Sequence, residues 1–135
     1  MTKLDALKKQ FSSALGRLEE ILQEEKTTII RDASVTRFEF TFDLSWKLMR
    51  AFLEERKGIT CVSPKDCIRE AFHYGAIGDD PVWTEMTDWR NAIVHEYSEE
   101  FANDLFAKLP EIFAAFKKLE EAIKKESLTD TTRTP

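Results

Sequence analysis

The residues best suited to chemistry in this chain occur in one short stretch, residues 89–97. Among apolar neighbours it contains an arginine, an asparagine, a histidine and a tyrosine, at Arg90, Asn91, His95 and Tyr97. Residues four apart share one face of a helix, so we expect Asn91 and His95 to lie together with Arg90 beside them. A cation, an amide, an imidazole and a phenol gathered at one place suit chemistry on a phosphate group.

Each of these residues also has a purely structural explanation. A single histidine near a helix end is more commonly a capping or packing residue than a catalyst, and an arginine there is commonly a surface charge. Function is favoured by the placement of polar groups inside an apolar segment, where burial without a purpose costs free energy. Tyr97 follows the expected helix end, and we expect its hydroxyl to fold back beside the imidazole of His95.

A second group of polar residues lies on an earlier segment, where Arg37 and Lys47 flank a run of aromatic residues. The structural interpretation, core aromatics with charges at their edges, is the preferred one. In the functional alternative, Arg37 and Lys47 add positive charge to a cleft near Arg90. No spacing of His, Cys, Asp or Glu is typical of a metal site, and no glycine-rich phosphate loop occurs. We therefore expect neither a metal nor a cofactor.

The apolar residues recur at the three-four spacing of amphipathic helices and nowhere alternate as in a strand. Capping and stop residues divide this pattern into helices. Helix starts are predicted at Ser34, Ser63-Pro64, Asp80-Pro81 and Ser98, and helix ends at Gly58 and Gly75. Pro110 is expected to kink or restart the last helix. The sequence predicts an all-α bundle of helices over residues 3–30, 34–57, 64–74, 81–95 and 98 to about 126.

Length and charge limit the other possibilities. A chain of 135 residues is long enough for one domain, expected over residues 1–126, with residues 127–135 as a flexible polar tail. The net charge of −5 disfavours broad electrostatic binding of nucleic acid, so any site for a polyanion must be local. Without a signal peptide or membrane span in the sequence, we expect a cytoplasmic protein whose Cys61 and Cys67 are reduced thiols.

The order Arg-Asn-x-x-x-His-x-Tyr at residues 90–97 resembles the R-x4-6-H signature of HEPN domains. Its trailing tyrosine resembles the HepT-like branch of that group, also called nucleotidyltransferase substrate-binding subunits. Further segments resemble the same branch in the same order, at residues 37–47, 63–65, 68–71 and Trp83. The similarity extends to about Lys125.

This resemblance implies a four-to-five-helix antiparallel bundle that forms a homodimer, with two copies of the motif in one cleft. Active members are implied to cleave RNA without a metal. His95 would act as general acid or base toward the ribose 2′-hydroxyl, Arg90 would stabilise charge on the phosphate, and Asn91 would position it. The resemblance also implies that the active members are toxins and that a partner minimal nucleotidyltransferase adenylylates Tyr97. This modification would switch the toxin off.

Three functional hypotheses follow. The first is a HepT-like toxin of a toxin–antitoxin pair, a metal-independent endoribonuclease regulated by its nucleotidyltransferase partner. The second is a non-catalytic subunit that holds a nucleotide or another substrate for that partner, which the acidic net charge fits slightly better. The third is a helical dimer scaffold in which the motif only supports the interface.

Overall fold

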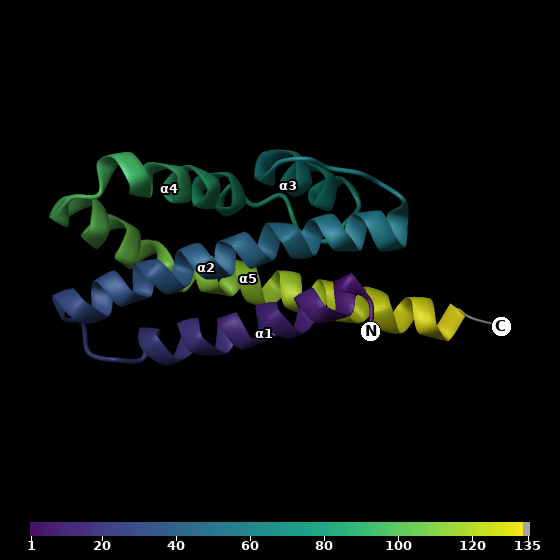
Figure 1. Cartoon of the computed structure of the whole chain (residues 1–135), viewed down its shortest axis with the longest axis horizontal. Helices are drawn as coiled ribbons and strands as arrows, with labels where there is room; N and C mark the ends of the chain where they lie inside the picture. The colour runs from purple at the N-terminus through teal and green to yellow at the C-terminus, as the bar shows by residue number, and fades with distance from the viewer. Residues whose placement is uncertain (134–135) are drawn as a thin grey trace.

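Every secondary-structure element of the protein is helical in the part of the chain that the structure describes. The computed structural model describes the backbone of residues 1–133 and the side chains of residues 1–126. In chain order the elements are α1 (Lys3–Leu22), α2 (Thr28–Phe52), the short π-helix η1 (Leu53–Lys57), α3 (Pro64–His73), α4 (Val82–Glu96) and α5 (Glu99–Arg133). The predicted all-α class, with three long and two short α-helices, is confirmed (Figure 1).

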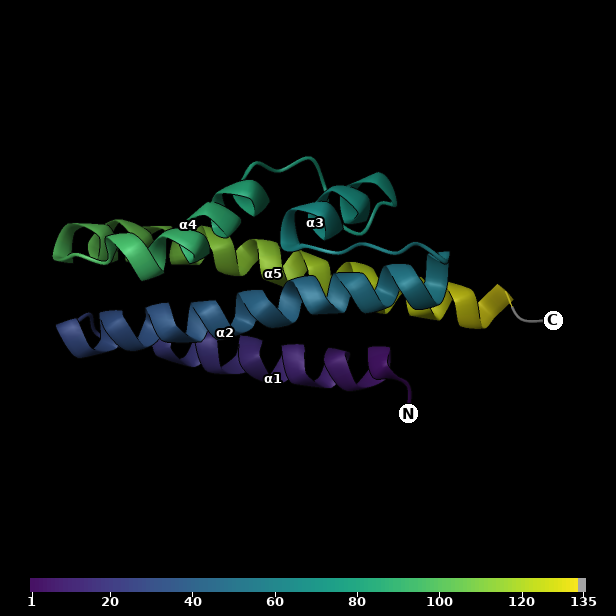
Figure 2. The same ribbon diagram turned by 45° about the horizontal axis from the view of Figure 1, so that its top comes forward.

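The three long helices lie side by side and the two short ones cover one side of them. Helices α1, α2 and α5 pack against one another, and α3 and α4 lie in a second layer over α2 and α5 (Figures 1 and 2). The chain turns back between α4 and α5 within a few residues. The end of α4, which carries the motif, lies beside the beginning of α2, where Tyr97 contacts Asp32.

The core of the bundle is centred on aromatic side chains from four helices. Phe116 of α5 packs edge-on against Phe11 of α1 and Trp83 of α4, with ring centroids 5.9 and 5.8 Å apart, and stacks on Phe38 of α2 at 6.4 Å. All four residues are almost completely buried. Burial of such large apolar surfaces supplies the main driving force that holds the two layers together.

The break between the first two helices lies earlier in the chain than predicted. α1 ends at Leu22 rather than near residue 30, and α2 begins at Thr28, where the hydroxyl of Thr27 accepts a hydrogen bond from the amide of Ile30 at 3.0 Å. Ser34, the predicted cap, lies inside α2 and donates its hydroxyl proton to the carbonyl of Ile30 at 2.6 Å. The earlier start is consistent with local chemistry, since threonine is also a good N-cap.

The other helix boundaries agree closely with the sequence. Gly58 adopts a positive φ of 67° at the end of η1, a backbone conformation that favours glycine. Ser63 caps α3 through the amide of Asp66 at 3.2 Å, and Ser98 accepts from the amide of Phe101 at 3.1 Å at the start of α5. Pro110 lies within α5, which continues through it instead of restarting.

The prediction of two reduced thiols is wrong in this structure. Cys61 and Cys67 form a disulfide that joins the loop before α3 to the first turns of that helix. Both residues are completely buried. Six positions separate them, a spacing that matches no familiar metal or redox motif, so no local pattern in the sequence indicates the pairing.

The domain boundary predicted at residue 126 stays a prediction. The backbone of α5 is helical to Arg133, whereas residues 134–135, and the side chains from residue 127 onward, lie outside the described residues. Across the described residues, no helix combines the length and the apolar character needed to cross a membrane.

Candidate active site

Arg90, the arginine of the motif, is held in place by α2. Its Nη2 atom donates a hydrogen bond to the carboxylate of Asp43 at 2.8 Å, and its guanidinium lies 5.9 Å from the ring centroid of Phe42. Its Nη1 atom lies 3.4 Å from the side-chain oxygen of Asn91, a long hydrogen bond. The Arg90 side chain remains one-third exposed. A charge-assisted bond and an aromatic face therefore fix the guanidinium while part of it stays accessible to a ligand.

A second carboxyl group lies beside this pair. Glu39 precedes Asp43 by one turn of α2, so the two side chains share a face. Partial burial raises the pKa of Glu39, and the negative charge of Asp43 raises it further, whereas Arg90 opposes the shift. Arg90 consequently lies beside two carboxyl groups, and one of them, Glu39, holds its proton more tightly than an ordinary glutamate.

His95 is exposed at the last turn of α4. Within the described part of the chain, no hydrogen bond or ion pair fixes its imidazole. Asn91, one turn earlier on the same face, is also exposed. The structure brings Arg90 and Asn91 together, and His95 follows Asn91 by one turn of α4, exposed to solvent. The burial of polar groups that the sequence argument considered is not observed for Arg90, which is partly exposed, or for His95, which is exposed.

Tyr97 takes a direction that the sequence did not predict. Its hydroxyl donates a hydrogen bond to the Oδ1 atom of Asp32 near the start of α2, at 2.5 Å, instead of folding back beside the imidazole of His95. Its ring packs against Phe101, with centroids 6.0 Å apart. Partial burial and the Asp32 carboxylate together raise the pKa of Tyr97 to about 12. The phenol is therefore neutral at physiological pH.

The partner of Tyr97 belongs to a larger polar network around Arg31. The Nε atom of Arg31 lies 3.0 Å from Asp32, and its two terminal nitrogens donate to the Glu99 carboxylate at 2.7 and 3.2 Å. A further bond of 3.3 Å joins Arg31 to Asn103. Arg31 is only 3% exposed. In the sequence, Arg31 and Asp32 fall in a predicted break between helices and Asp43 is not distinctive, because partners more than 40 residues away leave no local pattern.

The two residues predicted as extra cleft charges face α1. Arg37 donates to the backbone carbonyl of Arg17 in α1 at 2.6 Å. Lys47 lines a hollow together with residues of α1, among them Leu7 and Gln10. Among the described residues, no hydrogen bond joins either of them to Arg90 or its partner Asp43, and their contribution to a cleft stays a prediction.

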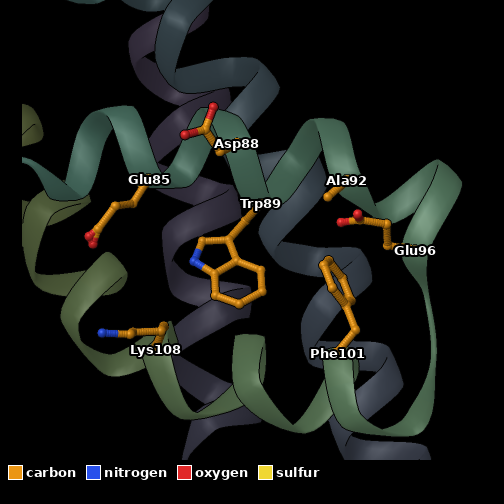
Figure 3. Close-up of a pocket in the computed structure, with 7 residues that line it drawn as sticks. All are labelled: Glu85, Asp88, Trp89, Ala92, Glu96, Phe101 and Lys108. Atoms are coloured by element: carbon orange, nitrogen blue, oxygen red, sulfur yellow. The ribbon is translucent and has the colours of Figure 1, made fainter.

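A groove of about 410 Å³ lies on the opposite side of α4, against α5. The rings of Trp89 and Phe101 form its apolar floor, 5.2 Å apart, and Glu85, Asp88 and Glu96 supply three carboxylates at its edges (Figure 3). Such an edge repels phosphate groups even with Lys108 nearby. The face of α4 that carries Arg90 and Asn91 is the better place for a phosphate.

A family model described as "Nucleotidyltransferase substrate binding protein like" matches residues 5–125. The chain belongs to this family. The match covers every helix that builds the site, from α1 to most of α5. The resemblance inferred from the residues at positions 90–97 is thereby confirmed at the level of the family.

Individual family relatives agree with this assignment. A Haemophilus influenzae protein named "Probable ribonuclease HepT" is 31% identical over 107 residues, which cover 76% of this chain and 73% of that protein. A crystal structure from Thermus thermophilus superposes with a TM-score of 0.79 and 33% identity, covering 84% of this chain and 98% of that one. A second structure, from Haemophilus influenzae and described as the fold of a substrate binding domain of a nucleotidyltransferase, gives a TM-score of 0.64 and 25% identity over 90% and 96% of the two chains.

Proposed function

We propose that this chain is a HepT-like toxin: a metal-independent endoribonuclease that a partner minimal nucleotidyltransferase keeps in check. The observation that carries the proposal is the partly exposed Arg90 beside Asn91, one turn before the exposed His95, in a chain similar to a probable ribonuclease HepT. RNA is the implied substrate. The cytoplasm, where RNA is abundant, is the proposed compartment.

The chemistry would be an attack of the ribose 2′-hydroxyl on the adjacent phosphorus. His95 would accept the hydroxyl proton or protonate the departing 5′-oxygen, the role that histidine takes most often in proton transfer. Arg90 would hydrogen-bond the non-bridging oxygens as negative charge accumulates, and Asn91 would orient them. The reaction needs both an acid and a base, and it breaks the bond from phosphorus to the 5′-oxygen as the bond to the 2′-oxygen forms.

A homodimer would supply the second proton-transferring group. One chain brings one histidine to this face, and that histidine is directed at solvent. A second copy related by twofold symmetry would bring its own Arg90 and His95 to the same cleft, one histidine acting as base and the other as acid. Two copies of Arg90 would also provide local positive charge on a protein whose net charge is −5.

Regulation would act through Tyr97, two residues beyond His95. Transfer of a nucleotidyl group from the partner enzyme to the Tyr97 hydroxyl would put a bulky anion at the mouth of the cleft and repel RNA. Tyr97 as a residue is 43% exposed, which favours access of a partner enzyme to it.

The second hypothesis, a non-catalytic nucleotide-binding subunit, has one observation in its favour. Glu39 and Asp43 surround Arg90 with negative charge, which weakens the attraction of that site for a polyanion. Titration calorimetry of ATP into the protein, alone and with its nucleotidyltransferase, tests this alternative. Binding that survives Arg90→Ala would place the nucleotide away from the motif.

Growth of cells that express the chain tests the toxin proposal directly. Induction of the wild-type chain is expected to stop growth, whereas a variant with Arg90→Ala and His95→Ala is expected to be harmless at equal expression. An Arg50→Ala variant, which removes an exposed cation of α2 outside the motif, serves as the matched control and is expected to stay toxic. Toxicity of the double variant equal to that of wild type would exclude the motif as the source of toxicity.

A further inference from the structure

The hydroxyl of Tyr97 already forms a hydrogen bond with a group that could accept its proton. The distance from this hydroxyl to the Oδ1 atom of Asp32 is 2.5 Å. The two residues are 65 positions apart, and only the fold brings them together. An activated nucleophile typically shows this arrangement, a hydroxyl within hydrogen-bonding distance of a base that a third group orients.

The third group here is Arg31. Its Nε atom holds the same Oδ1 atom of Asp32 at 3.0 Å, while its terminal nitrogens bind Glu99 and Asn103 of α5. Arg31 is buried, whereas the Asp32 side chain is 46% exposed, so the carboxylate is held from the protein interior and stays open to solvent. The hydrogen bond from the Tyr97 hydroxyl lowers the pKa of Asp32, and the contact with Arg31 lowers it further. Asp32 is consequently an ionised, oriented carboxylate at neutral pH.

The phenol of Tyr97 needs such a partner in order to react. With its pKa raised to about 12, Tyr97 is ionised in only about one molecule in 10⁵ at pH 7. Direct attack by free phenolate would be slow at this occupancy. Removal of the proton during the attack itself avoids the rare ionised state, and general base catalysis of this kind typically gives a factor of about 10² to 10⁴.

We propose that Asp32 is the general base for modification of Tyr97, so that this chain supplies part of the machinery by which it is silenced. In the step, the Tyr97 oxygen forms a bond to the α-phosphorus of a nucleoside triphosphate. The bond from that phosphorus to the bridging oxygen breaks, pyrophosphate leaves with the bonding electrons, and the phenolic proton passes to Asp32 and then to water. Arg31, which contacts Asp32 directly, is the positioning residue for it. The inference rests on the proposed function, which makes Tyr97 the regulated residue.

Tyr74 is a built-in reference for the reactivity of Tyr97. It is the other tyrosine of the chain and is similarly exposed, at 38% compared with 43%. Its ring contacts the imidazole of His73 edge-on, at 5.1 Å. No carboxylate within the described residues forms a hydrogen bond with its hydroxyl. A difference in reactivity between the two tyrosines therefore reports on Asp32 and not on exposure alone.

The test uses a chemical donor of the nucleotidyl group, adenosine 5′-phosphorimidazolide, so that no partner enzyme is needed. The purified full chain is incubated with the donor, and peptide mass spectrometry follows adenylylation of Tyr97 and Tyr74 over time. In wild type we expect Tyr97 to react faster than Tyr74. In Asp32→Asn we expect the Tyr97 rate to fall by at least about tenfold while the Tyr74 rate is unchanged.

The alternative mechanism, attack by free phenolate, predicts that the Tyr97 rate changes in the opposite direction in Asp32→Asn. If free phenolate were the reacting species, removing the charge of Asp32 would lower the pKa of Tyr97 and make Tyr97 react faster. The pH dependence separates the two routes as well. If Asp32 removes the proton, the Tyr97 rate should change little between pH 6 and 8 while the Tyr74 rate rises, so the ratio of the Tyr97 rate to the Tyr74 rate should fall. If both residues react as free phenolates, both rates rise together and the ratio should stay constant.

Glu99→Gln controls for a merely structural role of Asp32. This variant weakens the support of Arg31 but leaves the contact between Asp32 and Tyr97 intact, so we expect less than about a threefold change in the Tyr97 rate. Three results would each overturn the inference. The first is an equal loss of the Tyr97 rate in Glu99→Gln and Asp32→Asn, and the second is an unchanged or higher Tyr97 rate in Asp32→Asn. The third is a wild-type protein in which Tyr97 reacts no faster than Tyr74. None of these readouts involves RNA, so failure of the nuclease proposal would be seen separately.

Discussion

The guanidinium of Arg90 and the carboxylate of Asp43 form a charge-assisted hydrogen bond of 2.8 Å between α4 and α2. The pair fixes the direction of the arginine in the absence of a ligand. Only one terminal nitrogen of Arg90 is used by Asp43, which leaves other N–H groups for a phosphate. Asp43 therefore acts as a positioning residue for the motif and also as a negative charge close to the proposed phosphate position.

The first prediction concerns this pair. Asp43→Asn should lower kcat for RNA cleavage by about tenfold, because Arg90 is no longer held in place for the transition state. KM should not rise, since the substitution removes a negative charge near the bound phosphate. Steady-state cleavage of a short RNA measures both constants. Asp104→Asn removes an exposed carboxylate from α5 and is the matched control; equal kinetics for the two variants would argue against a role of Asp43.

The second prediction uses the raised pKa of Glu39. The folded state holds the Glu39 proton more tightly than the unfolded chain does, so this carboxyl opposes folding as the pH rises through its folded pKa. Glu39→Gln should raise the Tm at pH 7 and have little effect near pH 4. Thermal unfolding at both pH values checks this. Glu25→Gln, at an exposed position, is the control and should change the Tm equally at the two pH values. An equal gain in Tm at pH 4 and pH 7 for Glu39→Gln would contradict the raised pKa of Glu39 as the cause.

The third prediction concerns the aromatic centre of the core. Phe116→Ala removes contacts with Phe11, Phe38 and Trp83 at once and leaves a cavity between the two layers. We expect the free energy of unfolding to fall by about 3–5 kcal/mol, as measured by urea denaturation. Phe40→Ala, at a position that is 62% exposed, should change it by less than about 0.5 kcal/mol. Similar effects at the two positions would mean that the core is centred elsewhere.

The fourth prediction concerns the disulfide between Cys61 and Cys67. Alkylation of the unfolded, unreduced protein should add no mass, and reduction should lower the free energy of unfolding by about 2 kcal/mol, the loop-closure value for so short a loop. Because disulfides are rare in the cytosol, the same alkylation applied to freshly lysed cells also tests the proposed compartment. Two alkylated thiols in the purified protein would show that the bond is not formed.

The sequence predicted those features that depend on neighbouring residues. Ser63 and Pro64 start α3, Gly58 ends η1, and Ser98 begins α5, because each of these effects acts within a few residues. The position of Ser34 shows the limit of such reasoning. Both Thr27 and Ser34 are good N-caps, and only packing of the preceding turn of α2 against the bundle selects the first of them.

The polar contacts of the site depend on the fold and were therefore missed. Tyr97 reaches Asp32 across 65 positions, and Arg31 reaches Glu99 across 68. Neither pair has a spacing that a single sequence could reveal. The residues of the motif itself were found because four chemically distinctive side chains occur within eight positions. The carboxylates that orient Arg90 and Tyr97 come from α2, and the three-dimensional arrangement was needed to identify them.

The most direct test of the central claim is cleavage of RNA by the purified protein in the presence of EDTA, compared with His95→Ala. Wild type is expected to cut RNA under chelation and leave ends with a 2′,3′-cyclic phosphate, and His95→Ala is expected to lose at least about a hundredfold in rate. His73→Ala, which removes the other histidine, is the matched control and should cut like wild type. Equal cleavage by wild type and His95→Ala, or none by a wild-type protein free of nucleotide on Tyr97, would contradict the account.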